Sequence, residues 1–349
     1  MVIDIIDIMK RTGMEEMRRT RTRTTKIAAR AGAAVFLLAA GLYAQETTKP
    51  ASPLTLSVPL TLSGFGQVEY VGQETGFDSF SIHRMRLSLT GEIIKGINFK
   101  LQVDAAKAAI LLDCYADITF HSAAKVRLGQ FKVPFSMESL ASDTEMDTIE
   151  RSQAVNKMAP GFDIGTNGRD IGAMLSGKAA FLEYSIGVFN GSGINKADTD
   201  DKKDWAARLL IRPASFLTFG ASAYDGQTVA TAGADPVKRA RLGLEGVFTY
   251  GDGSLKGEFI QAQDGTIMRQ GWYLQGAYFV LPKTLQGVVR FDSYDPDRNK
   301  DLNRSDLWIL GVNWFLAPMT KLQVDYVWSR TEAGTTANRA LQVQFQAGF

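Results

Sequence analysis

The sequence predicts an all-β protein, a transmembrane antiparallel β-barrel of sixteen strands. Three observations favour this fold class. Beyond residue 59, segments of about ten residues alternate apolar and polar side chains with a period of two, and no long stretch has a helical period. Tight turns and longer loops follow one another in alternation between these segments. A tilted strand of about ten residues is long enough to cross about 30 Å of hydrocarbon.

The N-terminal segment has the pattern of a signal peptide. Residues 18–30 carry six basic side chains and no acidic one, and an apolar run follows over 31–42. This run is too short to span a bilayer as a helix, and the alternative of a buried core helix leaves the basic flank unexplained. We therefore predict a signal peptide over 1–44, a flexible lead-in over 45–58, and a transmembrane barrel over 59–349.

The predicted strands differ in how clearly they alternate. Residues 322–329 and 341–349 alternate most regularly, whereas 216–224 and 305–316 are assigned from their spacing. Sixteen strands fit the pattern, and fourteen or eighteen are the alternatives. The predicted segments are 60–70, 79–93, 97–106, 110–121, 124–133, 169–178, 181–190, 204–212, 216–224, 237–250, 254–264, 269–281, 284–294, 305–316, 320–331 and 339–349.

The connections between these strands fall into two classes. Even-to-odd connections are tight turns such as Lys95-Gly96, whereas odd-to-even connections such as 191–203 are mostly longer and rich in Gly, Asp and Asn. This arrangement is typical of outer-membrane barrels, in which closure removes the strand edges that lipid cannot satisfy. A secreted β-sandwich or all-β repeat is the alternative. Aromatic residues near strand ends suit interfacial girdles; they are Trp205, Trp272, Trp314, Tyr326, Trp328 and Phe349.

Charge and composition exclude several classes of function. The chain has a formal net charge of +2, but residues 1–44 hold eight basic and four acidic side chains, so the remainder is at −2. This balance gives no support for nucleic-acid binding. Cys114 is the only cysteine, so the chain has neither an intramolecular disulfide nor a cysteine-based zinc site. We predict no cofactor, no metal and no catalytic residue.

The two histidines offer little for a barrel enzyme, the second class of function that we consider. A barrel protease or phospholipase needs a histidine beside an acid or serine partner. His83 falls on the lipid-facing parity of its predicted strand, and His121 lies at a short turn on the other rim. Neither position predicts a catalytic dyad.

Strand parity assigns a set of basic side chains to the lumen. When Leu87 and Leu89 face lipid, the neighbouring arginines face inward, and the same argument applies to the other strands. A charged side chain on the lipid face costs about 2–4 kcal/mol at the middle of the membrane, which favours this assignment. The predicted pore-lining basic residues are Arg84, Arg86, Lys100, Arg127, Arg208, Arg212, Arg239, Arg241 and Arg290.

The longest connection, residues 134–168, is the candidate constriction loop. Long loops in compact domains are usually functional or disordered, and a loop at this place in a wide barrel can fold inward and narrow the pore. The alternative is a solvated extracellular loop. Its predicted constriction residues are mostly acidic: Glu138, Asp143, Glu145, Asp147, Glu150, Arg151 and Lys157.

The middle of the chain resembles the phosphate-selective porin O/P family. The resemblance is carried by three stretches and the residues around them: Gly129-Gln-Phe-Lys-Val-Pro-Phe-Ser136 with Glu138 and Glu150-Arg-Ser152; Arg169-Asp-Ile-Gly172 with Gly177; and Gly187-Val-Phe-Asn-Gly-Ser-Gly193 with Lys203-Asp204 and Arg208. It implies a sixteen-stranded, usually trimeric outer-membrane channel with an inward-folded third loop, often preferring anions. Named members owe their phosphate preference to a ladder of lumenal arginines and to basic residues at the constriction. Here the arginines are present by parity, but the loop is acidic.

These observations predict a bacterial outer-membrane channel. Small hydrophilic solutes, with anions such as phosphate foremost, would diffuse passively through a water-filled lumen whose wall is basic and whose loop is acidic. The expected partners are outer-membrane lipid, small anionic or polar solutes and two further copies in a homotrimer, with no nucleic acid. A general porin without phosphate preference and a plugged structural or adhesive barrel are the alternatives.

Overall fold

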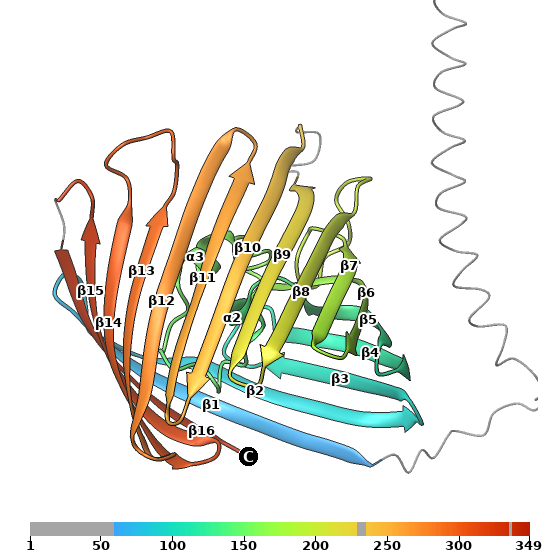
Figure 1. Cartoon of the computed structure of the whole chain (residues 1–349), viewed down its shortest axis with the longest axis horizontal. Helices are drawn as coiled ribbons and strands as arrows, with labels where there is room; N and C mark the ends of the chain where they lie inside the picture. Colours follow the sequence, from blue (N-terminus) through green and yellow to red (C-terminus); the bar gives the residue numbers. More distant parts are fainter. Residues whose placement is uncertain (1–58, 229–234, 335–336) are drawn as a thin grey trace, which may run out of the picture. The chain divides into compact units, whose positions relative to one another are not determined.

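A computed structural model describes residues 59–228, 235–334 and 337–349, which form a closed antiparallel barrel (Figure 1). The predicted signal peptide and lead-in lie outside the described residues. The strands are β1 (Leu60–Gln73), β2 (Ser79–Ile94), β3 (Ile97–Asp104), β4 (Leu111–His121), β5 (Ala124–Lys132), β6 (Arg169–Ala179), β7 (Leu182–Phe189), β8 (Asp204–Ala214), β9 (Leu217–Thr228), β10 (Val237–Tyr250), β11 (Gly253–Asp264), β12 (Ile267–Leu281), β13 (Leu285–Asp295), β14 (Ser305–Ala317), β15 (Thr320–Thr331) and β16 (Ala337–Gly348).

Each strand pairs with its neighbours in sequence, and the first strand closes the barrel on the last. β1 pairs with β2 on one side and with β16 on the other, in a register that runs from Phe65 opposite Gly348 to Gln73 opposite Ala340. Every predicted strand is present, and the largest difference at an end is in β9, which continues four residues beyond the predicted limit at 224. The predicted fold class and strand number are confirmed.

The outer face of the barrel is apolar and aromatic. All five tryptophans are exposed there, by 39 to 57% of their surface. Val289 and Leu244 likewise present 47% and 60% of their surface outward, while the charged residues beside them in sequence are buried. Such an apolar surface, in a barrel without free strand edges, suits a lipid environment.

The buried apolar cluster lies inside the barrel rather than between two sheets. It joins wall residues such as Phe131, Phe189 and Ile260 to residues of the long loop, among them Phe135 and Met158. Because the loop packs on this patch, the lumen is partly filled by apolar contacts, and the remaining wall is polar.

Two short helices interrupt the loop between β5 and β6, where the sequence predicted no helix. Helix α2 spans Met137–Leu140 and α3 spans Gln153–Met158. Each is capped by a serine whose hydroxyl accepts a backbone N–H hydrogen bond: Ser136 from residue 139 and Ser152 from residue 155. No helix in the described residues is both long and apolar enough to span a membrane.

A β-bulge in β2 corrects the predicted orientation of His83. Gln67 of β1 pairs with Arg84, but the next residue, Val68, pairs with Ile82, so His83 is the extra residue of the bulge. Ile82 is 61% exposed on the outer face, whereas His83 contacts lumenal groups. The predicted lipid-facing orientation of His83 is wrong because the alternation along the strand is broken at the bulge.

Gly129 begins the stretch that resembles the porin O/P signature, and the backbone explains why it is glycine. Its φ is +126°, and a Cβ atom there would lie 2.2 Å from the carbonyl oxygen of Cys114. The glycine lets β5 lie close against β4 just before the chain enters the loop.

Candidate pore constriction

The loop between β5 and β6 lies inside the barrel (Figure 1). Its residues make hydrogen bonds to side chains on strands from around the wall, including Gln67 of β1, Ser222 of β9 and Asp325 of β15. A loop in contact with such widely separated strands crosses the lumen. We call residues 133–168 the constriction loop.

Wall carboxylates accept hydrogen bonds from the loop backbone. Glu258 of β11 accepts from the N–H groups of residues 137 and 138 at 2.9 and 2.7 Å, at the start of α2. Asp292 of β13 accepts from Gln153 at 2.7 Å, at the start of α3. Asp325 of β15 accepts from Ile149 at 2.8 Å. These contacts satisfy N–H groups that a helix or an irregular segment leaves unpaired.

Wall cations bind the loop carbonyl groups in the same way. Lys132 of β5 donates to the carbonyl oxygens of residues 139 and 141 at 2.8 and 2.7 Å. Arg241 of β10 donates to Met158 at 2.8 Å, and Lys321 of β15 donates to Met146 at 2.6 Å. The wall therefore fixes the path of the loop by hydrogen bonds to the loop backbone. The loop sequence alone does not encode this path.

Two predicted loop acids are buried in ion pairs. Asp143 accepts from Arg86 and Arg151, and Arg84 lies 3.5 Å away. Glu138 pairs with Arg290, whose side chain is fully buried, and also accepts from the N–H of Ser152 at 2.8 Å. Four of the predicted wall and loop cations thus neutralise two loop carboxylates.

The other predicted loop residues differ in their surroundings. Asp147 contacts Lys256 at 2.6 Å and accepts from Gln275 at 2.7 Å. Glu150 is partly exposed and lies beside His83. Glu145 and Lys157 are exposed.

The remaining predicted wall cations are also paired. Arg239 and Arg241 both contact Asp163 of the loop, at 2.6 and 2.8 Å. Arg127 forms two 2.7 Å hydrogen bonds with Asp117 and lies over the ring of Tyr115. The other pairs are Lys100 with Asp113, Arg208 with Glu245 and Arg212 with Glu183.

An open cavity of about 320 Å³ remains between the loop and the wall formed mainly by β2–β8. Its lining includes Phe65, Tyr115 and Phe131 among polar groups. Six basic side chains and three acidic ones line it: Arg86, Lys100, Arg127, Lys132, Arg169 and Arg208, with Asp113, Asp143 and Glu183. Basic side chains therefore outnumber acidic ones among the residues that line this cavity.

Sequence reasoning missed several groups that shape this site. Lys132 and Arg169 stand at the two ends of the loop, outside the clear alternation of β5 and β6. Glu258, Asp292 and Asp325 are inward by parity but were not singled out, because their partners are backbone groups far away in sequence. One signal could have located the bulge at His83. The apolar residues of β2 switch there from even positions, such as Ile82, to odd positions, such as Leu87.

Asp143 provides a pH-dependent prediction. Burial alone would raise the pKa of its carboxyl, but the guanidinium groups of Arg151, Arg84 and Arg86 outweigh burial and hold the pKa well below its usual range. A depressed pKa stabilises the folded state above the unfolded-state pKa of about 3.9, and this stabilisation is lost as pH falls toward the folded-state pKa. We expect wild type to exceed Asp143→Asn in unfolding free energy by a constant margin from pH 8 to about 5, with the margin shrinking at lower pH.

Urea unfolding of both proteins between pH 3 and pH 8 measures this margin. The exposed Glu145 supplies the control, because Glu145→Gln should leave the free energy of unfolding nearly unchanged across the range. A margin for Asp143→Asn that grows on acidification would contradict the ion-pair assignment.

A closed sixteen-stranded barrel with an apolar exterior, and with a loop folded into its polar lumen, is the architecture of a porin. The model of the family described as phosphate-selective porin O and P matches residues 62–237 and 225–349. The chain belongs to this family of outer-membrane porins, which are channels rather than enzymes.

Solved porins share the fold. DcaP of Acinetobacter baumannii, an outer-membrane channel, has 13% identity and a TM-score of 0.63, over 86% of this chain and 100% of DcaP. In-vitro folded OmpT of Vibrio cholerae, solved in a trimer form, has 12% identity and a TM-score of 0.60, over 84% of this chain and 99% of OmpT. Salmonella typhi OmpF, in complex with daunomycin, has 10% identity and a TM-score of 0.60, over 82% of this chain and 97% of OmpF. A search of curated proteins gave no match.

Proposed function

We propose that this porin passes small hydrophilic solutes by passive diffusion and prefers anions such as phosphate. The observation that carries the proposal is the charge of the cavity beside the constriction loop, with six basic side chains against three acidic ones. A solute crossing here leaves bulk water and meets guanidinium and ammonium groups that attract anions and repel cations.

The loop does not cancel this positive charge, although its sequence is acidic. Glu138, Asp143 and Asp147 are held in ion pairs with buried or half-buried cations, so their charge is compensated. Within the described part of the chain, Lys132 also lines the cavity, where it donates to two loop carbonyl groups and makes no ion pair with a carboxylate. The sequence predicted an acidic loop opposite a basic wall. We propose instead that the solute passes a predominantly basic surface.

We also propose that the chain is exported by a signal peptide and assembles as a homotrimer. Residues 1–44 would direct the chain to the outer membrane as a cleaved signal peptide. A homotrimer is supported by the trimer form in which the structurally similar Vibrio OmpT was solved. Cross-linking of the protein extracted from membranes tests the trimer, and N-terminal sequencing of the mature chain tests the cleavage.

Single-channel recording in a planar bilayer tests the selectivity. With a tenfold KCl gradient, we expect a reversal potential of the sign for anion selectivity, and phosphate added to the bath should reduce the chloride current. Lys100→Gln should reduce the anion selectivity, because Lys100 lines the cavity and its side chain is 27% exposed there. Lys283→Gln is the control, since Lys283 is exposed in the turn between β12 and β13 and does not line the cavity.

The alternatives correspond to other outcomes of this recording. Open steps with no selectivity, unaffected by phosphate, would identify a general porin; the ion pairs of Arg127 and Arg208 favour this second candidate because they reduce the free positive charge. A folded barrel that conducts nothing would be a plugged structural or adhesive barrel.

A further inference from the structure

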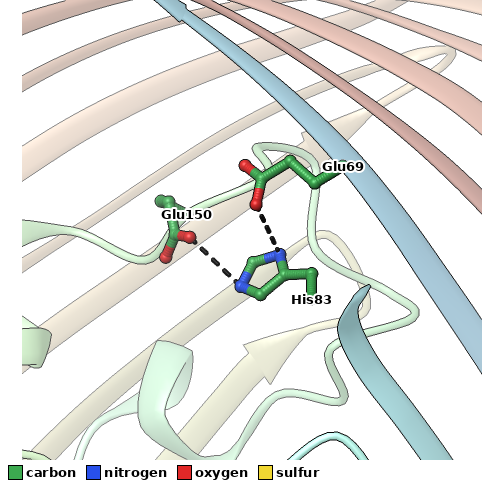
Figure 2. A group of neighbouring side chains, drawn as sticks. All are labelled: Glu69, His83 and Glu150. Atoms are coloured by element: carbon green, nitrogen blue, oxygen red, sulfur yellow. Dashed lines mark ion pairs between the residues drawn. The ribbon is translucent and has the colours of Figure 1, made fainter. Parts of the chain in front are cut away.

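Glu69, His83 and Glu150 meet at the edge of the constriction (Figure 2). Glu69 comes from β1, His83 from the bulge of β2 and Glu150 from the constriction loop. The two carboxylates approach different nitrogens of the imidazole, with Nδ1 3.4 Å from Oε2 of Glu69 and Nε2 3.2 Å from Oε1 of Glu150. One ligand atom from each side chain lies within 4.8 Å of the other two.

A chain of amides fixes which nitrogen of His83 carries hydrogen. The amide nitrogen of Gln344 donates to Oε1 of Gln323 at 3.1 Å, so Oε1 of Gln344 is the atom that faces Nδ1 of His83 at 2.9 Å. An amide oxygen only accepts, so Nδ1 is the donor. Nη1 of Arg84 also lies 3.3 Å from this nitrogen, and one of its two hydrogens is donated to Gln67 at 2.9 Å.

The other nitrogen of His83 then presents a lone pair to a carboxylate. Nε2 of the neutral ring and Oε1 of Glu150 face each other at 3.2 Å, and two electron pairs at this distance repel unless a cation lies between them. Ligand atoms at 2.0–2.1 Å from a tetrahedral metal ion are about 3.3 Å apart. The spacing therefore suits two atoms that share one metal ion.

An unpartnered oxygen supplies a second, independent observation. The side chain of Glu69 is only 8% exposed, and its Oε1 atom has no hydrogen-bond partner among the described residues. A buried carboxylate oxygen without a partner is costly, and a bound cation would satisfy it. Metal-binding histidines commonly donate their second ring N–H to a fixed acceptor, and Gln344 has this role for His83.

We propose that Glu69, His83 and Glu150 form a binding site for a divalent transition-metal cation of the Zn²⁺ class, which joins the constriction loop to the wall. One imidazole nitrogen with carboxylate oxygens suits Zn²⁺ better than Mg²⁺ or Ca²⁺, which prefer oxygen ligands alone. The side chain of Glu150 is 41% exposed, so a cation enters the site from the pore. The sequence predicted no metal because the chain has only one cysteine and two histidines.

Titration calorimetry of the folded porin in detergent with ZnCl₂ tests the site. We expect wild type to bind a single Zn²⁺ per chain, and His83→Gln and Glu69→Gln to lose this binding. His121→Gln is the matched control, because His121 is the only other histidine and lies at the end of β4, among residues of the opposite rim. Gln344→Ala should weaken binding by about tenfold or more, as expected for the loss of a group that orients a metal-binding histidine.

A variant in the loop keeps the test independent of strand folding. Glu150→Gln changes a partly exposed loop residue that takes no part in strand pairing, and it should also lose Zn²⁺ binding. Electron paramagnetic resonance with Cu²⁺ in place of Zn²⁺ should show coupling to nitrogen in wild type and in His121→Gln, but not in His83→Gln. Retained binding in His83→Gln, or no binding by wild type at millimolar Zn²⁺, would overturn the proposal and leave a proton as the cation between His83 and Glu150.

Discussion

Replacement of Arg290 by methionine is expected to destabilise the folded porin by about 3–5 kcal/mol, the usual cost of removing one partner from a buried ion pair. Arg290 is fully buried and pairs with Glu138, whose side chain is 2% exposed. It also donates to Gln275 at 2.9 Å. Without the guanidinium, the carboxylate of Glu138 keeps its burial but loses its countercharge. Urea unfolding at neutral pH measures the loss of free energy.

Two variants separate this effect from the simple loss of an arginine. Arg330→Met removes an exposed arginine of β15, and it should change the unfolding free energy by no more than about 0.5 kcal/mol. The double variant Arg290→Met, Glu138→Gln should recover part of the loss, because it removes the unpaired buried charge. Equal costs for Arg290→Met and Arg330→Met would contradict the assignment of a buried pair.

Replacement of residues 137–164 by a short Gly-Ser linker is expected to raise single-channel conductance several-fold. Helices α2 and α3 would leave the lumen, and the passage would widen to the wall of the barrel. Anion selectivity should fall at the same time, because solutes would pass farther from the basic side chains. The barrel should still fold, since none of the strand pairings includes the loop.

The matched control shortens a different loop on the same rim. Residues 297–302 lie in the connection between β13 and β14, and their removal should leave conductance near the wild-type level. An unchanged conductance after removal of residues 137–164 would show that the constriction loop does not limit the current.

Strand positions could be predicted from the sequence because lipid and lumen impose opposite demands on neighbouring residues. Val289 faces outward and Arg290 inward, and this contrast repeats along most strands. The ion pairs could not be predicted in this way. Asp143 and Arg86 are 57 residues apart, and their contact depends on the path of the loop across the lumen, which wall side chains such as Lys132 determine.

The error at His83 has a physical cause of the same kind. A single inserted residue shifts the parity of everything before it, so Ile82 and Leu87 both face lipid although one number is even and the other odd. A strict period of two therefore assigned the only lumenal histidine to the membrane. The apolar pattern on both sides of the bulge contains the information needed to locate it.

The anchors of the constriction loop also imply an order of assembly. Glu258, Asp292 and Asp325 bind loop residues that precede them by 120, 139 and 176 positions in the chain. The loop reaches its place only after the C-terminal half of the barrel has formed around it, because closing such long segments of chain is entropically unfavourable until strand pairing has brought their ends together. The newly closed barrel is thus wide at first, and its narrow passage is the last part of the molecule to take shape.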